Sequence, residues 1–393
     1  MDNSLANRVQ RVKPSPTLAV TARAAELRAA GHDIIGLGAG EPDFDTPEHI
    51  KEAAIEAIRA GKTKYTAVDG TPELKQAIQQ KLSNENGLDY ELNQILVSAG
   101  AKHSIYNVMQ AVVDTDDEVI VPIPYWVSYP DMAKLADGVP RFIEATAEQR
   151  FKITPEQLEA TLNDKTRLVI LNSPSNPTGV AYTRAELEAL GKVLQDYPRA
   201  LVLTDDIYEH ILWAEESFTN IVNACPALND RTIVINGVSK GYSMTGWRIG
   251  YAAGPADVIG AMKKIQSQST SNPCSIAQAA ATAALTGDQE CIAPMLKAFQ
   301  ERHDFVVSAL NNIKGVEAIA GDGTFYTFPK VQGAIENLGL KTDIELAEHL
   351  INEANVALVP GSAFGLDGYA RISFATSMEN LEKAMKRLEN ALN

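Results

Sequence analysis

Residues 232–251 read Thr-Ile-Val-Ile-Asn-Gly-Val-Ser-Lys-Gly-Tyr-Ser-Met-Thr-Gly-Trp-Arg-Ile-Gly-Tyr and form the most informative stretch of the chain. The apolar run 232–235 predicts a buried strand, and Lys240 follows it in a turn of small residues. A lysine at the end of a buried strand can be partly desolvated, which leaves its amine neutral and able to condense with a carbonyl group. Arg248 offers a planar fork that suits phosphate. The alternative for Lys240 is an ordinary solvated surface lysine.

Short apolar runs alternate with amphipathic stretches on both sides of this segment. This alternation predicts an α/β fold with a mostly parallel sheet. The expected strands are residues 95–98, 118–122, 168–172, 201–205, 232–236 and 249–253, and the expected helices are 72–86, 104–113, 184–194 and 255–265.

The pattern changes after about residue 295, where a smaller α+β unit is expected. Its predicted elements are a polar helix at 298–312, strands at 316–320, 325–328 and 370–374, and a C-terminal helix that begins at a capping box of Thr376 and Glu379. A further helix is predicted at 17–30, closed by Gly31. We therefore expect a large domain at 47–295 and a small domain formed by 1–46 together with 296–393.

Composition narrows the classes of partner. The 393 residues carry a formal net charge of -15, which argues against general binding of nucleic acid or anionic membranes, although local cations can still hold an anionic substrate. The 3 cysteines are scattered and predict reduced thiols in a cytoplasmic protein. No histidine pair has metal-ligand spacing, no apolar run approaches the ~20 residues of a membrane helix, and Met1-Asp2-Asn3-Ser4-Leu5 does not look like a secretory signal.

Three more segments carry residues suited to chemistry. The segment 98–102, Ser-Ala-Gly-Ala-Lys, leaves a strand and opens a helix, and the N–H groups and positive end of such a helix suit an anion. The segment 172–179, Asn-Ser-Pro-Ser-Asn-Pro-Thr-Gly, is a loop after a strand. The segment 205–208, Asp-Asp-Ile-Tyr, follows another strand and could be either a carboxylate site or a capped turn.

A carbonyl-reactive lysine beside a phosphate-binding arginine suits pyridoxal phosphate. The stretch around Lys240 resembles the lysine signature of the class I (fold type I) aminotransferases, and the resemblance extends over nearly the whole chain. It implies a pyridoxal-phosphate-dependent transferase that has a large domain with a mostly parallel, seven-stranded sheet and a smaller α+β domain.

The resemblance also implies roles for individual residues. Lys240 would bind the cofactor, Asp205 would pair with its ring nitrogen, and Tyr208 with Asn176 would hydrogen-bond its phenolic oxygen. Trp126 would stack on the ring, with core packing as the alternative. The phosphate contacts would be Gly100, Ala101, Lys102, Ser239 and Arg248, with Tyr65 reaching in from a neighbouring subunit, so that a homodimer has composite active sites. Two positions depart from the family pattern: Asp206 stands where glutamate is usual, and Gly237 where some relatives have serine.

The implied substrates are amino acids and 2-oxo acids. Arg371 matches the arginine that clamps the α-carboxylate, and Gly40 matches the backbone that meets the same group. Trp126 and Asn176 would also line the substrate site. Lys102 and Thr17 resemble the pattern of bacterial aspartate aminotransferases and of enzymes that accept prephenate. The expected reaction is transfer from aspartate to 2-oxoglutarate, giving oxaloacetate and glutamate, with prephenate conversion to arogenate as a further activity.

The same residues are compatible with other functions of this fold type. Aromatic or alanine aminotransferases and carbon–sulfur lyases of the same fold type share much of this set, and a non-enzymatic protein of the same fold is a third class. Gly36, Gly38 and Gly40 could suggest a dinucleotide site, but their spacing differs from the G-x-G-x-x-G pattern, and Pro42 and Asp43 follow where a helix should begin.

Overall fold

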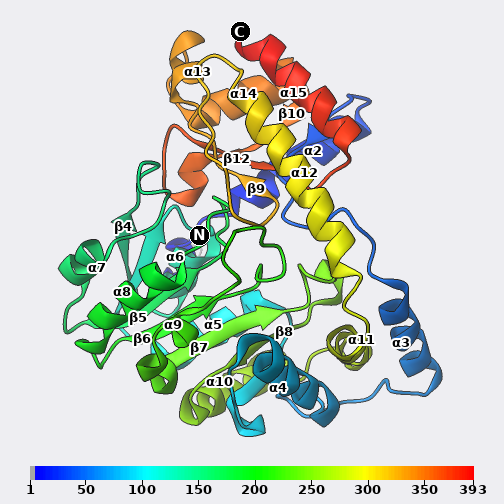
Figure 1. The fold of residues 1–393 in the computed structure, drawn as a ribbon, viewed down its shortest axis with the longest axis vertical. Coiled ribbons are helices and arrows are strands. Elements are labelled where there is room, and N and C mark those ends of the chain that lie inside the picture. Colours follow the sequence, from blue (N-terminus) through cyan, green and yellow to red (C-terminus); the bar gives the residue numbers. More distant parts are fainter. Residues whose placement is uncertain (1–4) are drawn as a thin grey trace.

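The computed structural model describes residues 5–393, so the expectation about residues 1–4 of the N-terminal segment lies outside them. Figure 1 shows a large sheet layered with helices in the lower part of the view and a smaller unit containing the C-terminus above it. The strands are β1 Ile35–Gly36, β2 Ile95–Ser98, β3 Glu118–Ile123, β4 Val139–Glu144, β5 Thr166–Asn172, β6 Leu201–Asp205, β7 Thr232–Gly237, β8 Gly250–Ala253, β9 Tyr326–Thr327, β10 Val356–Ala357, β11 Val359–Pro360 and β12 Ala370–Ser373.

The α-helices cover the sheets and form most of the surface. They are α1 Asn7–Gln10, α2 Pro16–Ala29, α3 Glu48–Arg59, α4 Pro72–Asn86, α5 Ala101–Val112, α6 Ser128–Leu135, α7 Pro155–Thr161, α8 Arg184–Gln195, α9 Ile221–Ala224, α10 Ala256–Ser269, α11 Ser275–Thr286, α12 Ile292–Leu310, α13 Gln332–Asn337, α14 Asp343–Glu353 and α15 Met378–Leu392. Short 3₁₀ turns lie at Leu92–Gln94, Pro226–Arg231, Thr245–Trp247 and Gly361–Phe364.

The large sheet has seven strands in the order β2-β8-β7-β6-β5-β3-β4. Strand β8 runs antiparallel to both of its neighbours, and every other pair in the sheet is parallel. This arrangement confirms the predicted α/β class with a mostly parallel sheet. All six predicted strands are present, but β4 was missed because it is an edge strand whose residues are mostly exposed and therefore form no apolar run.

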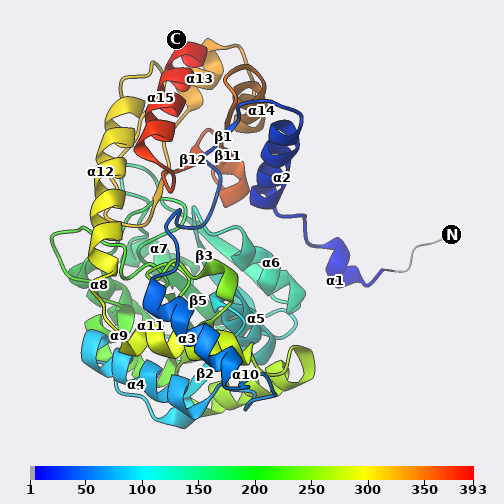
Figure 2. The ribbon, with the colours of Figure 1, turned by 90° about the vertical axis from the view of Figure 1, so that its right-hand side faces the viewer.

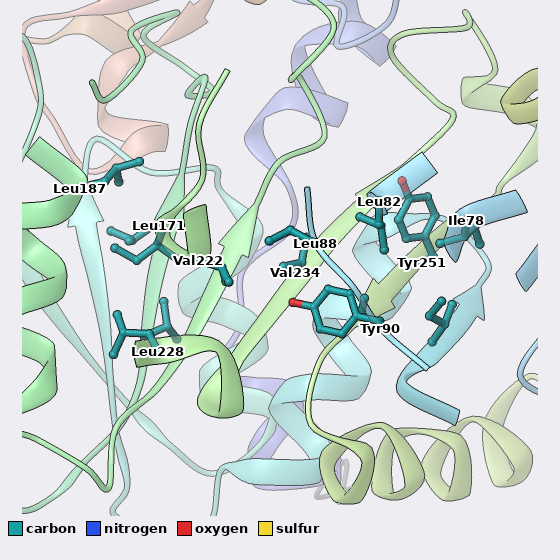
Figure 3. Close-up of a cluster of buried hydrophobic side chains, with 14 of the residues drawn as sticks. Ile78, Leu82, Leu88, Tyr90, Leu171, Leu187, Val222, Leu228, Val234 and Tyr251 are labelled. Atoms are coloured by element: carbon teal, nitrogen blue, oxygen red, sulfur yellow. The ribbon is translucent and has the colours of Figure 1, made fainter. Parts of the chain in front are cut away.

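Helices bury both faces of this sheet, which is why its central strands are apolar at nearly every position. One face carries a single hydrophobic cluster, in which Figure 3 shows Tyr251 of β8 beside Ile78 and Leu82 of α4, and Leu171 of β5 beside Leu187 of α8. Neighbouring residues of the same strands point to the other face and pack against α5 and α10. The sheet is thus held rigidly between two hydrophobic layers, and its strand ends form a stable base for a site.

The C-terminal part has its own core. Strands β11, β12 and β9 form a three-stranded sheet, and residues of α12, α14 and α15 pack in one cluster with it. Strand β1 pairs with β10, so the N-terminal segment joins this part of the molecule, and Figure 2 shows α2 lying beside it. The domain division at residues 47 and 295 stays a prediction; α12 begins at Ile292 and continues through that point.

Two details of the predicted small unit were wrong. Residues 316–320 form no strand, because the side chain of Asn311 bonds both the N–H and the carbonyl of Ala318, which leaves a single bridge from Glu317 to Lys330. The C-terminal helix is capped by Ser377, which accepts from the Asn380 N–H, and not by Thr376. Sequence position alone does not separate two adjacent hydroxyl residues as caps.

Two further findings concern composition. Cys225, Cys274 and Cys291 all carry free thiols. None of the helices within residues 5–393 has the combination of length and apolar character that crossing a bilayer requires.

Candidate active site

A cavity of about 450 Å³ opens at the C-terminal ends of the parallel strands. Asn172 and Asp205 end β5 and β6, and Lys240 follows β7. Ligands of open α/β sheets bind at this edge because successive strands deliver their loops there. Twelve of the sequence-predicted residues line the cavity: Thr17, Gly40, Ala101, Lys102, Trp126, Asn176, Asp205, Tyr208, Ser239, Lys240, Arg248 and Arg371.

Two residues of the predicted set do not line this cavity, and one of them, Tyr65, was expected to serve a neighbouring subunit. Gly100 lies directly behind the cavity wall, against Arg248. Tyr65 does not line the cavity of its own chain, and 93% of its surface is exposed. The cavity therefore brings together nearly all of the predicted set, and Tyr65 is the residue that points elsewhere.

Lys240 stands on the cavity floor, half-buried. Its Nζ donates a 2.5 Å hydrogen bond to the carbonyl of Gly40 and lies 5.7 Å from the ring centroids of both Tyr208 and Phe325. Burial, with the nearby Arg371 guanidinium as the next cause, lowers the pKa of Lys240 to about 8. A substantial fraction of this amine is therefore neutral near physiological pH, which a nucleophilic or basic lysine requires.

Arg371, on β12, is the most deeply buried cation of the cavity, with 3% of its surface exposed. Its Nη1 donates to Asn176 Oδ1 at 2.9 Å and its Nη2 donates to the Gly38 carbonyl at 2.8 Å, while Nε has no partner. Within residues 5–393 no carboxylate forms a salt bridge with it, and burial lowers its pKa. A buried guanidinium without a counter-ion is costly, so an anion from outside the chain would be strongly favoured here.

Two further cations face the same space. Lys102 Nζ lies 4.9 Å from the centroid of the Trp126 ring, and its pKa is lowered by burial and by Arg248. Arg248 donates to the Thr245 carbonyl at 2.7 Å. Against these four cations the cavity lining holds two carboxylates, Glu41 and Asp205. This excess of positive charge suits anionic ligands.

Gly100 shapes the wall beside Arg248. It has a φ of +90, and a Cβ at this position would lie 2.3 Å from Arg248 Nη2, so only glycine lets the guanidinium lie against the turn. No side chain caps the first turn of α5, which leaves backbone N–H groups and the positive helix end facing the cavity. Arg248 and this helix end together form a cradle suited to phosphate.

The glycine at 237 also has a structural reason. A Cβ there would lie 2.9 Å from both the Gly250 Cα and the Ile249 carbonyl oxygen. The serine that some relatives carry would crowd this backbone, so the strands β7 and β8 would have to shift to admit that phosphate donor.

Asp205 lies beneath the cavity, 4% exposed. The Tyr129 hydroxyl donates a 2.6 Å hydrogen bond to its Oδ2, and the Ile207 N–H donates to Oδ1 at 3.4 Å. Burial raises the pKa of Asp205 to about 6, while the Tyr129 hydrogen bond acts in the opposite direction. Sequence reasoning missed Tyr129; its position three residues after Trp126, whose ring it meets edge-on at 5.2 Å, was the available signal.

Asp206 turns away from the cavity. It accepts from Thr204 Oγ1 at 2.5 Å and from Asn220 Nδ2 at 2.9 Å, and burial raises its pKa to about 7. Its contacts tie the loop after β6 to the N-terminus of α9. The aspartate that replaces the usual glutamate at position 206 therefore stabilises the loop after β6 and does not line the cavity.

Tyr326, on β9, is the second residue that sequence reasoning missed. Its hydroxyl lies 3.1 Å from the hydroxyl of Tyr208, and its ring centroid lies 4.4 Å from Arg371 Cζ. No sequence motif marked it, because it reaches the cavity from a part of the chain more than 100 residues away from Tyr208.

The lining as a whole fits pyridoxal phosphate. It offers a lysine with a lowered pKa, a cradle for a phosphate, a buried carboxylate for a ring nitrogen, and an aromatic wall at Trp126. Each of these groups matches one part of the cofactor.

Comparison with known proteins agrees with this geometry. The family described as Aminotransferase class I and II matches residues 32–388. The chain is 57% identical to an aspartate/prephenate aminotransferase of Nitrosomonas europaea and 50% identical to an aspartate aminotransferase of Geobacillus stearothermophilus, over 99% and 98% of each chain respectively.

Solved structures show the same relationship. An aspartate aminotransferase from Rhizobium meliloti superposes with a TM-score of 0.95 at 47% identity, covering 99% of this chain and 98% of the other. A Thermus thermophilus aspartate aminotransferase with maleate gives a TM-score of 0.94 at 41% identity, covering 99% of this chain and 100% of the other. The chain therefore belongs to the class I and II aminotransferases.

Proposed function

We propose that this aminotransferase moves the amino group of aspartate to 2-oxoglutarate, giving oxaloacetate and glutamate, and that it also converts prephenate to arogenate. The names of the relatives support both activities. The maleate carried by the Thermus thermophilus protein is a dicarboxylate, as aspartate and 2-oxoglutarate are.

The observation that carries the proposal is the buried, unpaired guanidinium of Arg371. Its Nη atoms are fixed by Asn176 and Gly38, so the fork is held in place before a substrate arrives. A substrate α-carboxylate would supply the missing counter-ion through a bidentate pair. Because every amino acid and every 2-oxo acid carries this group, Arg371 serves all substrates alike.

Lys102 is proposed to select dicarboxylates. It lines the same cavity, has no carboxylate partner within residues 5–393, and is held over the Trp126 ring. A cation at a helix N-terminus opposes the helix dipole, so its position there calls for a nearby anion. The distal carboxylate of aspartate or of 2-oxoglutarate would supply one, and Thr17 stands on the same lining.

The family cofactor, pyridoxal phosphate, supplies an electron sink that stabilises negative charge developing at the substrate Cα. The backbone N–H groups of Gly100, Ala101 and Lys102 and the side chains of Ser239 and Arg248 would hold its phosphate, and Asp205 would keep its ring nitrogen protonated. Tyr129 holds Asp205 by the 2.6 Å hydrogen bond and thereby fixes which carboxylate oxygen is left for the cavity.

The other residues handle binding and protons. Lys240 Nζ, with its pKa near 8, can take a proton from the substrate Cα and later return one. Tyr208 and Asn176 offer a hydroxyl donor and an amide to the cavity, and the Trp126 ring forms part of its lining. Arg371 keeps the Cα oriented towards Lys240 by gripping the adjacent carboxylate.

The protein is proposed to work as a cytoplasmic homodimer. Tyr65 is almost fully exposed in the single chain and is absent from its own cavity. An exposed tyrosine of this kind would be explained if it reached the phosphate cradle of a second copy. Each site would then be composite.

A donor panel combined with two variants tests the substrate assignment. We expect aspartate and glutamate to be the best donors with 2-oxoglutarate. Lys102→Ala should reduce kcat/KM for them by roughly 30-fold or more, because breaking a desolvated charge pair costs about 2–5 kcal/mol. The same variant should change alanine turnover little, whereas Arg371→Ala should harm all donors alike. Lys264→Ala, an exposed lysine on α10, is the control for loss of one charge.

Other outcomes would support the alternatives. Equal losses for aspartate and alanine in Lys102→Ala would contradict dicarboxylate selection. Release of ammonia and pyruvate without an oxo-acid acceptor would indicate a carbon–sulfur lyase, and a preference for phenylalanine or alanine over aspartate would indicate an aromatic or alanine aminotransferase.

A further inference from the structure

The side chain of Tyr326 contacts both Tyr208, which faces the cofactor region of the site, and Arg371, which faces the substrate carboxylate region. It is only 1% exposed, yet it belongs to the cavity lining. Strand β9 pairs with β12 in an antiparallel register that places Tyr326 opposite Ser373, two residues from Arg371. Its ring supports the Arg371 guanidinium while its hydroxyl reaches Tyr208, on the loop after β6.

The hydroxyl contact has a consequence for the Tyr208 proton. Within residues 5–393, Tyr326 is the hydrogen-bond partner recorded for the Tyr208 hydroxyl, at 3.1 Å. Each phenol has one proton to donate and two lone pairs that can accept. Burial raises the pKa of both tyrosines, so both keep their protons at neutral pH. If the Tyr208 hydroxyl donates its proton to a group in the cavity, the Tyr208 oxygen can accept a hydrogen bond from the Tyr326 hydroxyl.

The ring contact adds a second link. A guanidinium 4.4 Å from an aromatic centroid is a cation–π pair, which is strong where water is excluded. Because Arg371 has no carboxylate partner of its own and its Nε has no partner, this ring is one of the few groups that support its charge and fix its plane. The nearby positive charge also makes the Tyr326 hydroxyl a better donor.

We propose that Tyr326 is a positioning residue that sets the donor strength of Tyr208 and the plane of Arg371 at once. The chain of donors runs from the Tyr326 hydroxyl to Tyr208 and on to an oxygen in the cavity, and each hydrogen bond polarises the next. The carboxylate-binding arginine and the cofactor-facing tyrosine are thereby held by one side chain from the C-terminal part. This inference rests on the roles of Tyr208 and Arg371 in the proposed function.

Two variants separate the hydroxyl contact with Tyr208 from the ring contact with Arg371. Tyr326→Phe keeps the ring and removes the hydroxyl, whereas Tyr326→Leu removes both. The first readout is the pH midpoint of the visible absorption band of the holoenzyme, which needs no substrate. Tyr326→Phe should raise this midpoint by about half a pH unit, because a Tyr208 that has lost its donor stabilises an unprotonated cofactor less well.

The second readout is the KM for amino donors. Tyr326→Phe should leave it within about twofold, while Tyr326→Leu should raise it roughly tenfold for aspartate and alanine alike, since the support of Arg371 is lost. Tyr369→Phe is the matched control, because this tyrosine stacks on Phe328 away from the cavity. Its midpoint and its KM should equal those of the wild type.

The outcomes are distinguishable. An unchanged midpoint in a folded Tyr326→Phe holoenzyme, or equal KM values in the Phe and Leu variants, would overturn the role of Tyr326. A purely structural role would lower the melting temperature of both variants without moving the midpoint, and would overturn it too. A wild-type protein with no titrating visible band would overturn the proposed function itself, and this inference with it.

Discussion

At the scale of single residues, the environment of Lys240 converts a common surface side chain into a reactive one. Burial removes water from the ammonium, and Arg371 adds repulsion, so the pKa of Lys240 falls from 10.5 to about 8. The carboxylates Glu41 and Asp205 act in the opposite direction but do not restore the ordinary value. The charged form is disfavoured because desolvation outweighs these attractions.

Labelling of the cofactor-free protein checks this directly. Acetylation by acetic anhydride requires the neutral amine, so its rate at Lys240 should rise about tenfold per pH unit below the pKa and level off above pH 8, whereas ordinary lysines continue to gain reactivity up to about pH 10.4. The sign follows from the lowered pKa, because Lys240 loses its proton earlier as the pH rises. Mass spectrometry of the peptide containing Lys240 gives the profile. A midpoint above about pH 9.5 would contradict the burial argument.

At the scale of elements, helix α4 is fastened to the loops that carry the site. Lys81, on α4, is buried and forms a salt bridge with Glu209, the residue after Tyr208. Glu209 also accepts from Asn236 Nδ2 on β7 at 2.8 Å and from Asn86 Nδ2 at 2.8 Å. Glu85, Glu209 and His210 come close enough to share a metal, but the Lys81 ammonium already lies among these groups.

Removal of the lysine should therefore be costly. Lys81→Met leaves Glu209 buried without its ammonium partner, which should lower the free energy of unfolding by about 3–5 kcal/mol. The double variant Lys81→Met with Glu209→Gln should recover part of this loss, because the orphaned charge is gone. Gln80→Met, an exposed position on the same helix, is the control. Denaturant unfolding of the four proteins measures the effect, and equal stability of Lys81→Met and wild type would refute it.

At the scale of the whole molecule, the proposed homodimer makes each site depend on two chains. Tyr65→Ala and Lys240→Ala proteins should each have little activity, and mixing them under conditions of subunit exchange should restore about a quarter of wild-type activity by random pairing. In a hybrid dimer, one site has Lys240 from the first chain and Tyr65 from the second. The measurement is aspartate turnover before and after exchange.

A second mixture tests whether mixing and subunit exchange restore activity when no complete site can form. Tyr65→Ala mixed with the double variant Tyr65→Ala/Lys240→Ala should regain nothing, because no hybrid site is then complete. Recovery in this mixture, or no recovery in the first, would show that Tyr65 serves its own chain or no site at all.

Much of the site could be predicted because its residues lie in loops with strong local signals. The loops around Asn176, Asp205 and Lys240 each follow a strand whose apolar run is plain in the sequence, so the parallel sheet delivers them to one edge. Tyr326 could not be found in this way, and Tyr129 had only its spacing from Trp126 to mark it. Their role depends on which side chains they meet across the fold, and a buried tyrosine in sequence looks the same whether it packs in a core or faces a cavity.

The sequence by itself determined the fold class and the strands of the central sheet other than β4, since periodicity and loop composition are local properties. Its resemblance to the family added twelve of the residues that line the cavity. Tertiary structure decided the rest. It left Arg371 buried without a counter-ion, gave Lys240 its lowered pKa, replaced the strand at 316–320 by side-chain bonds from Asn311, and turned Tyr65 outward. These features depend on burial and on contacts between distant segments, which exist only when the chain is folded.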